Sequence, residues 1–164
     1  MANRGQPEEA ARLKQANAAA FEAAFGPDDH DSITALQDLA VIQELCGDFA
    51  GAEKAYQEAS KRFARTGQGN TYDGFQCLNN GAWCRFLQGD SSGAKNLFVE
   101  ARSRARDLFG PEHPITLDIQ HRLARVLRER GQMADAEELA RETLAARKQV
   151  LAPNDGRTAY TMTV

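Results

Sequence analysis

The chain has 164 residues, of which 42% are hydrophobic and 26% are charged, and its formal net charge is −3 at pH 7. This composition is typical of a folded, soluble chain and argues against a disordered tail. The negative charge argues against general binding to nucleic acid or anionic lipid, because both usually require a basic surface. The sequence contains neither the long apolar run of a membrane span nor the apolar block of a signal peptide, so we expect a cytoplasmic protein.

A repeat with a period of 42 residues runs along the chain. Glycine recurs at this interval, at Gly5, Gly47, Gly89 and Gly131. Alanine keeps the same interval five residues after each glycine, at Ala10, Ala52, Ala94 and Ala136. A fixed period of this length is the signature of a repeat protein.

The period predicts a single array over residues 1–164. In chain order, the predicted parts are the second helix of a partial repeat, three complete repeats and the start of a truncated repeat: 5–30, 31–70, 71–112, 113–154 and 155–164. Stacked repeats normally carry polar caps at their ends, whereas the last residues include Tyr160, Met162 and Val164. We therefore expect either a fragment of a longer array or a chain that covers its end by self-association.

Each complete repeat reads as two amphipathic helices. In the third repeat, apolar residues follow helical spacing on both sides of a glycine. They are Leu123, Ala124 and Leu127 before Gly131, and Met133, Ala136, Leu139, Ala140 and Leu144 after it. We expect Gly131 to end the first helix in a left-handed conformation and Ala136 to allow the two helices to approach closely.

The segments between repeats contain proline and acidic residues that end the preceding helix. The hydroxyl residues Ser32, Thr116 and Thr158 follow them. We expect these residues near the next helix starts, where a hydroxyl oxygen can accept a hydrogen bond from a free backbone N–H. The middle linker, "TGQGNTYDGF", lacks the proline and gains glycines. This linker is predicted to be the loosest in the chain.

The third repeat and its linker carry a specific resemblance. The segments "LARVLRERGQMADAEELA" and "FGPEHPIT" combine an "LA…G" pattern, an alanine five residues after the glycine and the 42-residue period. The sequence thereby resembles tetratricopeptide repeats of the kinesin light chain type, over about residues 5–164. The resemblance implies an all-α fold: an α-solenoid of antiparallel helix pairs in a right-handed superhelix, whose first helices line a concave groove for extended peptides or partner helices.

The groove face implied by this resemblance recurs at every third or fourth position of each first helix. The expected groove residues are Gln37, Val41, Glu44, Asn79, Trp83, Phe86, His121, Arg125 and Arg128. The segment "LNN" at Leu78–Asn80 matches the family's "LNNLA", in which asparagine holds the backbone of a peptide through its paired donor and acceptor. Only Asn79 carries this role over directly, because Gln37 and His121 replace asparagine in the other repeats.

The two aromatic groove positions leave two interpretations open. Trp83 is the only tryptophan, and such rings often anchor binding energy. Alternatively, Trp83 and Phe86 rotate inward to fill the space that Gly81 leaves empty. A half-buried Trp83 is compatible with both roles.

The first helix of the third repeat contains a group of arginines. Arg125 and Arg128, with Arg122 adjacent, are suited to an acidic or phosphorylated segment through charge-assisted hydrogen bonds. The alternative is a solvated charged face, in which Asp118 pairs with Arg122 four residues later.

Cysteine and histidine give no catalytic or metal-binding pattern. The cysteines form no CxxC pair, which fits reduced thiols, and we expect Cys46 and Cys84 to pack as small apolar residues. His121 is the only histidine that folding could bring near Cys77 or Cys84, without a recognised ligand spacing. No phosphate-binding loop is present, so we expect no enzyme, no cofactor and no metal.

These patterns predict a non-enzymatic protein–protein interaction scaffold. Its partner would be a protein or peptide with acidic residues near Arg125 and apolar residues near Trp83. The same type of array occurs as the sensor part of larger signalling proteins. The alternative is a structural module that self-associates into homo-oligomers through its uncapped ends. Binding of RNA is disfavoured by the acidity of the chain and by the lack of repeated base-reading side chains.

Overall fold

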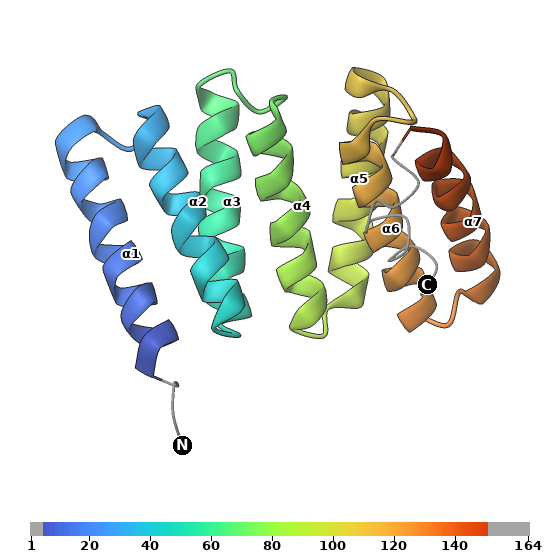
Figure 1. The fold of residues 1–164 in the computed structure, drawn as a ribbon, viewed down its shortest axis with the longest axis horizontal. Helices are drawn as coiled ribbons and strands as arrows, with labels where there is room; N and C mark the ends of the chain where they lie inside the picture. Colours follow the sequence, from blue (N-terminus) through green and yellow to red (C-terminus); the bar gives the residue numbers. More distant parts are fainter. Residues whose placement is uncertain (1–4, 151–164) are drawn as a thin grey trace. The chain divides into compact units, whose positions relative to one another are not determined.

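The computed structural model describes residues 5–150, which form seven α-helices and no strand (Figure 1). The chain divides into two compact units, unit 1 (Met1–Gln88) and unit 2 (Gly89–Val164). Unit 1 contains α1 (Gly5–Phe25), α2 (His30–Leu45), α3 (Phe49–Arg65) and α4 (Tyr72–Leu87). Unit 2 contains α5 (Ser91–Phe109), α6 (Pro114–Glu129) and α7 (Met133–Val150).

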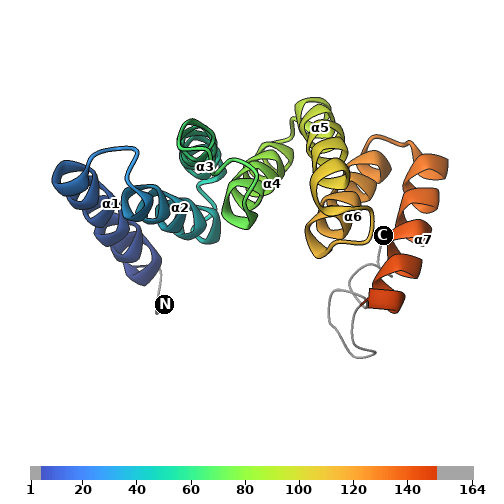
Figure 2. The same ribbon diagram turned by 90° about the horizontal axis from the view of Figure 1, so that it is seen from above.

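Within each unit, helices that follow one another in sequence pack side by side. In unit 1, α1 packs against α2, α2 against α3 and α3 against α4; in unit 2, α6 packs against both α5 and α7. Figure 2 shows α3 set back from α2 and α4, so that α2 and α4 share one side of unit 1. The boundary between the units falls between α4 and α5, which the sequence assigns to one repeat, so the single array over residues 1–164 stays a prediction.

Three of the repeat glycines adopt the expected left-handed conformation, whereas Gly5 is the first residue of α1. Their φ angles are 81° at Gly47, 92° at Gly89 and 74° at Gly131. After two of them, the next N–H reaches back to a carbonyl five residues earlier, from Asp48 to Gln43 at 2.9 Å and from Gln132 to Leu127 at 3.0 Å. This bond closes the end of the first helix before the chain reverses.

Three of the repeat alanines lie at close helix contacts, as expected, whereas Ala10 on α1 is half-buried. Ala52 and Ala94 are fully buried and Ala136 exposes only 3% of its surface. Each lies in the first turn or the second turn of the helix that follows the glycine, where a larger side chain would push the neighbouring helix away.

Two of the predicted N-caps are wrong. α2 is capped by Asp29, whose carboxylate accepts the N–H of Asp31 at 2.9 Å, and α6 is capped by His113, whose Nδ1 accepts the N–H of Ile115 at 3.3 Å. Both helices therefore begin earlier than the hydroxyl residues suggested. Ser32 and Thr116 are buried inside the helices, and Thr158 lies outside the described residues.

The middle linker is closely packed rather than loose. A Cβ on Gly74 would lie 2.8 Å from the carbonyl oxygens of both Gln68 and Gly69, and a Cβ on Gly69 would lie 3.1 Å from Cα of Ala64. Thr71 caps α4 by accepting the N–H of Gly74 at 3.3 Å. The glycines thus allow backbone segments to approach closely, a role that is compatible with the loss of proline.

The core of unit 1 lies between α2, α3 and α4. Its buried residues are Ile33, Ala40, Ala52, Ala55, Tyr56, Ala59, Phe63, Cys77 and Cys84. Burial raises the pKa of the Cys77 thiol to about 12, so this cysteine is unreactive at neutral pH. Cys46 differs from the prediction: it is exposed, because it is the C-cap residue of α2 rather than a core position.

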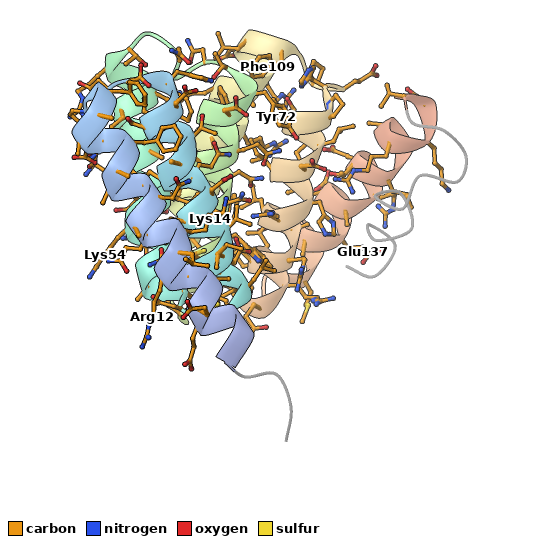
Figure 3. All side chains as sticks on the ribbon, turned by 60° about the vertical axis from the view of Figure 1, so that its left-hand side comes forward. Arg12, Lys14, Lys54, Tyr72, Phe109 and Glu137 are labelled. Atoms are coloured by element: carbon orange, nitrogen blue, oxygen red, sulfur yellow. The ribbon has the colours of Figure 1, made fainter. Side chains whose placement is uncertain are left out.

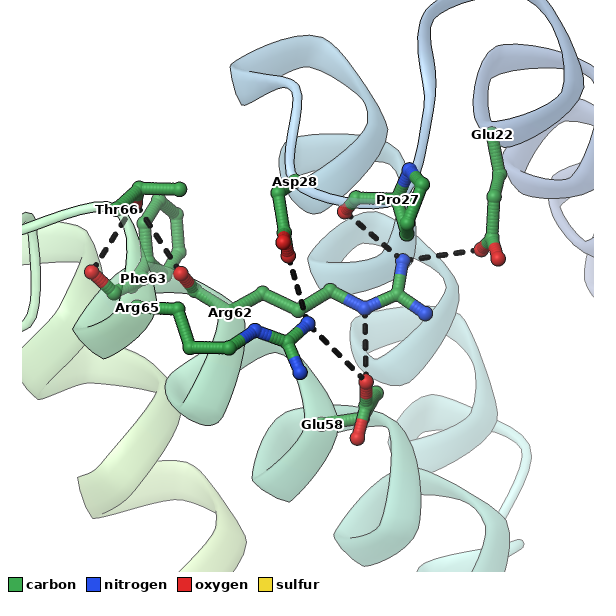
Figure 4. Close-up of polar contacts among 8 residues, drawn as sticks. All are labelled: Glu22, Pro27, Asp28, Glu58, Arg62, Phe63, Arg65 and Thr66. Atoms are coloured by element: carbon green, nitrogen blue, oxygen red, sulfur yellow. Dashed lines mark hydrogen bonds and ion pairs between the residues drawn. The ribbon is translucent and has the colours of Figure 1, made fainter.

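A polar network fastens the α1–α2 connection to α3 (Figure 4). Arg62 of α3 donates through Nη1 to Glu22 at 2.9 Å and to the carbonyl of Pro27 at 3.1 Å, and through Nε to Glu58 at 2.9 Å. The hydrogen bond from Arg62 lowers the pKa of Glu58. A second ion pair joins α1 to α2: Lys14 on α1, labelled in Figure 3, pairs with Asp38 of α2 at 2.6 Å.

In unit 2, α6 is the most enclosed helix and α7 is anchored to it by a buried cation. Arg147 of α7 exposes 1% of its surface, and its Nη2 donates to Asp118 at 2.5 Å and to the carbonyl of Leu117 at 3.3 Å. Thr143 of α7 donates to Gln120 at 3.3 Å.

Within residues 5–150, none of the helices has the length and apolar content required to span a lipid bilayer.

Candidate functional site

The first helices of the predicted repeats are α2 and α4 in unit 1 and α6 in unit 2. On α2, Gln37 and Glu44 are half-buried, whereas Val41 exposes 39% of its surface. Leu45, one turn after Val41, exposes 77%. The end of α2 therefore presents two apolar side chains to solvent.

Glu44 is held by a hydrogen bond inside unit 1. The buried phenol of Tyr56, on α3, donates to Glu44 Oε2 at 3.2 Å. Burial, and then the Glu44 carboxylate, raise the pKa of Tyr56, so the phenol stays protonated and remains a donor. This predicted groove residue thus combines a structural bond with partial exposure.

Trp83 and Phe86 form an aromatic pair on α4. Both are half-buried, their ring centroids lie 4.9 Å apart and their planes are tilted by 33°. Leu87, four residues after Trp83, exposes 38% of its surface. Partial burial is the state that is compatible with both a packing role and a contact role for Trp83. We call Val41, Leu45, Trp83, Phe86 and Leu87 the unit 1 face.

Asn79 is placed differently from the expectation of an open groove position. It exposes only 4% of its surface. Residues on several sides of α4 are buried along with it, including Phe75, Cys77 and Ala82, because most of the circumference of the helix is covered. In this structure, the Asn79 amide is therefore not presented to solvent.

The predicted groove residues of α6 also differ in their exposure to solvent. His121 exposes 3% of its surface, Arg125 and the adjacent Arg122 are half-buried, and Arg128 is exposed. We call Arg122, Arg125 and Arg128 the unit 2 face. The carboxylate of Asp118, which the sequence placed near Arg122, is bound by Arg147 from α7.

The electrostatics of α6 are those of a basic surface. The pKa of His121 is lowered to about 4 by burial and by the positive charges of Arg147, Arg125, Arg122 and Arg128. His121 is consequently neutral at pH 7. The same potential that disfavours the imidazolium favours an anion placed against the unit 2 face.

Among residues 5–150, no group of three histidine, cysteine, aspartate or glutamate side chains is arranged to hold a metal ion. The buried His121 is neutral, and the buried Cys77 thiol has a raised pKa. The unit 1 face offers apolar side chains, and the unit 2 face offers arginines.

Sequence reasoning missed Leu45 and Leu87. Each follows a predicted groove residue by four positions, Val41 and Trp83 respectively, and so lies on the same side of its helix. Extending the predicted face by one helical turn would have found both leucines.

Comparisons with known proteins test the repeat prediction. Residues 75–149 match the family model described as tetratricopeptide repeat. This part of the chain is therefore similar to tetratricopeptide repeats. No curated protein matches the sequence.

Solved structures extend the similarity of fold to almost the whole chain. Two crystal structures of a Podosopora anserina protein named as a kinesin light chain with nearly identical tetratricopeptide-like repeats, one of them a point variant, match with TM-scores of 0.79 and 0.77. Each is 20% identical, and the match covers 96% of this chain and 74% of the other.

A third structure, BtubC (BKLC) from P. vanneervenii, matches with a TM-score of 0.71 and 18% identity, over 80% of this chain and 53% of that protein. The resemblance to kinesin light chain-like tetratricopeptide repeats and the all-α solenoid of helix pairs are thus confirmed at the level of the fold.

Proposed function

We propose that this tetratricopeptide repeat chain is a non-enzymatic scaffold that binds an extended peptide or a partner helix of another protein on its first helices. Tetratricopeptide repeats generally mediate protein–protein interaction, and kinesin light chain-like repeats are typically non-enzymatic scaffolds. A role as the sensor part of a larger signalling protein is a further step of this proposal, suggested by the resemblance alone.

The observation that carries the proposal is the unit 1 face. Leu45, Val41 and Leu87 expose 77%, 39% and 38% of their surfaces, and the half-buried Trp83 and Phe86 lie on the same face of α4. Exposed apolar side chains and half-buried aromatic rings are typical of binding sites, because a partner removes them from water.

The unit 2 face adds a preference for charge. Arginines at every third position of α6, and the lowered pKa of His121 among them, support binding of a segment with acidic residues. Gln37, Glu44 and Asn79 complete the proposed groove set, with Asn79 requiring some movement of α4 before its amide can reach a peptide backbone.

A peptide array tests this function directly. We would probe the purified chain with peptides of about 12 residues in which apolar content and net charge vary independently, and then measure affinities in solution by the emission of Trp83, the only tryptophan. We expect peptides with apolar and acidic residues to bind and to shift the emission to shorter wavelength, because the indole loses contact with water.

Leu45→Ser should weaken the best peptide by roughly fivefold to tenfold, since one exposed leucine loses its apolar contact. The matched control is Leu13→Ser, because Leu13 exposes 63% of its surface on α1, outside both faces. Equal effects of the two substitutions, or binding that is independent of apolar content, would contradict the proposal.

One observation favours the alternative, a self-associating module. On α1, alanines share solvent exposure with Leu13, at Ala16, Ala19, Ala20, Ala23 and Ala24. A second copy could pack on such a stripe of small residues because it permits close helix approach.

A further inference from the structure

A trench runs between α5 and α7 in unit 2, with α6 as its floor. Its volume is about 330 Å³. The lining residues are Lys95, Val99 and Arg102 of α5, Leu123 and Leu127 of α6, and Asp135, Glu138, Leu139 and Glu142 of α7. The floor leucines Leu123 and Leu127 are almost fully buried, so the apolar contact open to an occupant comes mainly from Val99, which is 49% exposed.

The two walls carry opposite charges. The α5 wall presents Lys95 and Arg102, and the α7 wall presents Asp135, Glu138 and Glu142. On α7 these residues recur every three to four positions, and on α5 Lys95 and Arg102 lie seven positions apart, so each set lies on one helix face. A partner that lies along the trench therefore meets a basic edge on one side and an acidic edge on the other.

One end of the trench is closed by a side-chain bridge. Gln132, in the α6–α7 turn, accepts from Lys95 Nζ at 2.9 Å and donates to Asp135 at 3.0 Å. The other end continues into a second hollow of about 420 Å³, which shares Val99 and Arg102 and adds Ser103, Arg106 and Asp107. The hollow surface thus extends along α5 from Lys95 to Arg106, about three helical turns.

Arg102 lies where the two hollows meet, and none of the residues in 5–150 forms an ion pair with it. Its Nε is buried and has no hydrogen-bond partner among the described residues. The pKa of Arg102 is lowered by burial and then by the charge of Arg106, which outweigh the attraction of Glu142. A carboxylate placed beside Arg102 and Arg106 would offset the repulsion between their positive charges.

We propose that this trench is a docking site for an amphipathic helix of a partner protein, with acidic residues along the edge that faces α5 and basic residues along the edge that faces α7. A helix fits because the apolar floor and both charged walls repeat at helical spacing, so one occupant meets all three in register. The occupant belongs to another protein rather than to a second copy because the opposed charges of the two walls select a helix with two differently charged edges.

This site is distinct from the first-helix faces. Leu123 and Leu127 are each two positions from Arg125, about 200° around α6, so the trench floor and the unit 2 face lie on opposite sides of that helix. The two proposals consequently stand or fall on different residues.

Designed peptides test the trench. The probe is a labelled, capped helix of about 15 residues with leucine at helical spacing, glutamate along one edge and lysine along the other. Two comparators carry glutamate on both edges or lysine on both edges. By fluorescence polarisation we expect the mixed-edge peptide to bind about tenfold more tightly than either comparator, because only this peptide meets both walls with opposite charge.

Matched substitutions locate the binding. Val99→Glu should weaken the mixed-edge peptide by about tenfold or more, because it places a charge on the apolar path. Leu108→Glu is the control, since Leu108 lies on the same helix with 48% exposure, against 49% for Val99, and does not line the trench. Circular dichroism confirms that both variants keep the helical content of the parent.

Charge reversal tests the acidic wall. Glu138→Lys should weaken the mixed-edge peptide and tighten the peptide with glutamate on both edges. Its control is Glu137→Lys, the same charge change at the neighbouring residue of α7, which is labelled in Figure 3 and does not line the trench. Glu137 pairs with Arg141 at 2.6 Å. Leu45→Ser on the unit 1 face should leave both affinities unchanged, so failure of the first-helix proposal would not imply failure here.

Three outcomes would overturn the proposal: no binding of the mixed-edge peptide up to about millimolar concentration, equal losses in Val99→Glu and Leu108→Glu, or equal binding of all three peptides. A molecular mass that rises with concentration in the parent, and no longer does so in Val99→Glu, would identify a second copy as the occupant and would also overturn it.

Discussion

Two arginines with almost fully buried side chains bind helices together in this protein. Arg62 ties α3 to α1 and to the α1–α2 connection, and Arg147 ties α7 to the start of α6. Each has a carboxylate and a backbone carbonyl as acceptors, which offsets the cost of burying a cation. Arg62 also bonds Glu58 within α3, but the partners outside each arginine's own helix lie 29 to 40 residues away in sequence, so no local pattern indicated that these arginines would be enclosed.

His121 gives a prediction at the same scale. Its pKa of about 4 in the folded chain lies below the usual value of 6.5, so the unfolded chain takes up a proton first as pH falls. The stability that depends on neutral His121 is present above pH 6.5 and is lost as pH falls from 6.5 to 4. We expect the free energy of unfolding of the parent to fall by about 1–3 kcal/mol over this range because of His121. In His121→Asn this part of the decrease should be absent.

Urea unfolding at pH 7 and at pH 4.5 measures this effect. Other groups, such as Glu58, titrate in both proteins, so the difference between parent and variant isolates the histidine. An identical pH dependence of the two proteins would show that burial and the neighbouring arginines do not hold His121 neutral.

At the scale of helices, glycine has two different roles in α4. Gly74 lies against the carbonyls of the α3–α4 turn, where an added Cβ would approach to 2.8 Å, whereas the only neighbour of a Cβ on Gly81 would be Cβ of Tyr56 at 3.4 Å. Both glycines are inside one helix, and the sequence alone does not distinguish them. The difference arises from packing with residues outside α4.

Alanine substitutions test this difference. Gly74→Ala should lower the free energy of unfolding by about 1–3 kcal/mol, because backbone atoms must shift to admit the methyl group. Gly81→Ala should raise it by up to about 1 kcal/mol, because alanine favours a helix interior and finds room there. Chemical denaturation measures the free energy of unfolding of both variants. Equal destabilisation by the two substitutions would contradict the close approach of Gly74 to the carbonyl oxygens of the α3–α4 turn.

At the scale of the whole molecule, the two proposed functions predict different masses in solution. A specific interface buries about 1,200–2,000 Å², and a single helix that exposes Leu13 and Phe25 among alanines offers only a small part of that area. We therefore expect the chain to sediment as a monomer across a concentration series, with the same result for Leu13→Asp. A mass that rises with concentration in the parent and not in Leu13→Asp would favour the self-associating module.

The repeat period determined much of this molecule from the sequence alone. The spacing of Gly47, Gly89 and Gly131 located the helix corners, and the alanine register located close helix contacts, because both depend on local backbone geometry and side-chain size. The resemblance of the third repeat led to the family that residues 75–149 match. Period and local geometry are properties of neighbours in sequence, so the sequence suffices for them.

Only the tertiary structure decided how far each predicted site residue is exposed. Asn79 and His121 were predicted on the same groove face as Val41 and Arg128. The first two are almost fully buried, whereas the last two reach solvent. The trench between α5 and α7 likewise depends on which side chains three helices bring together. Burial and charge neighbourhood are set by contacts distant in sequence, and these form only when the helices pack.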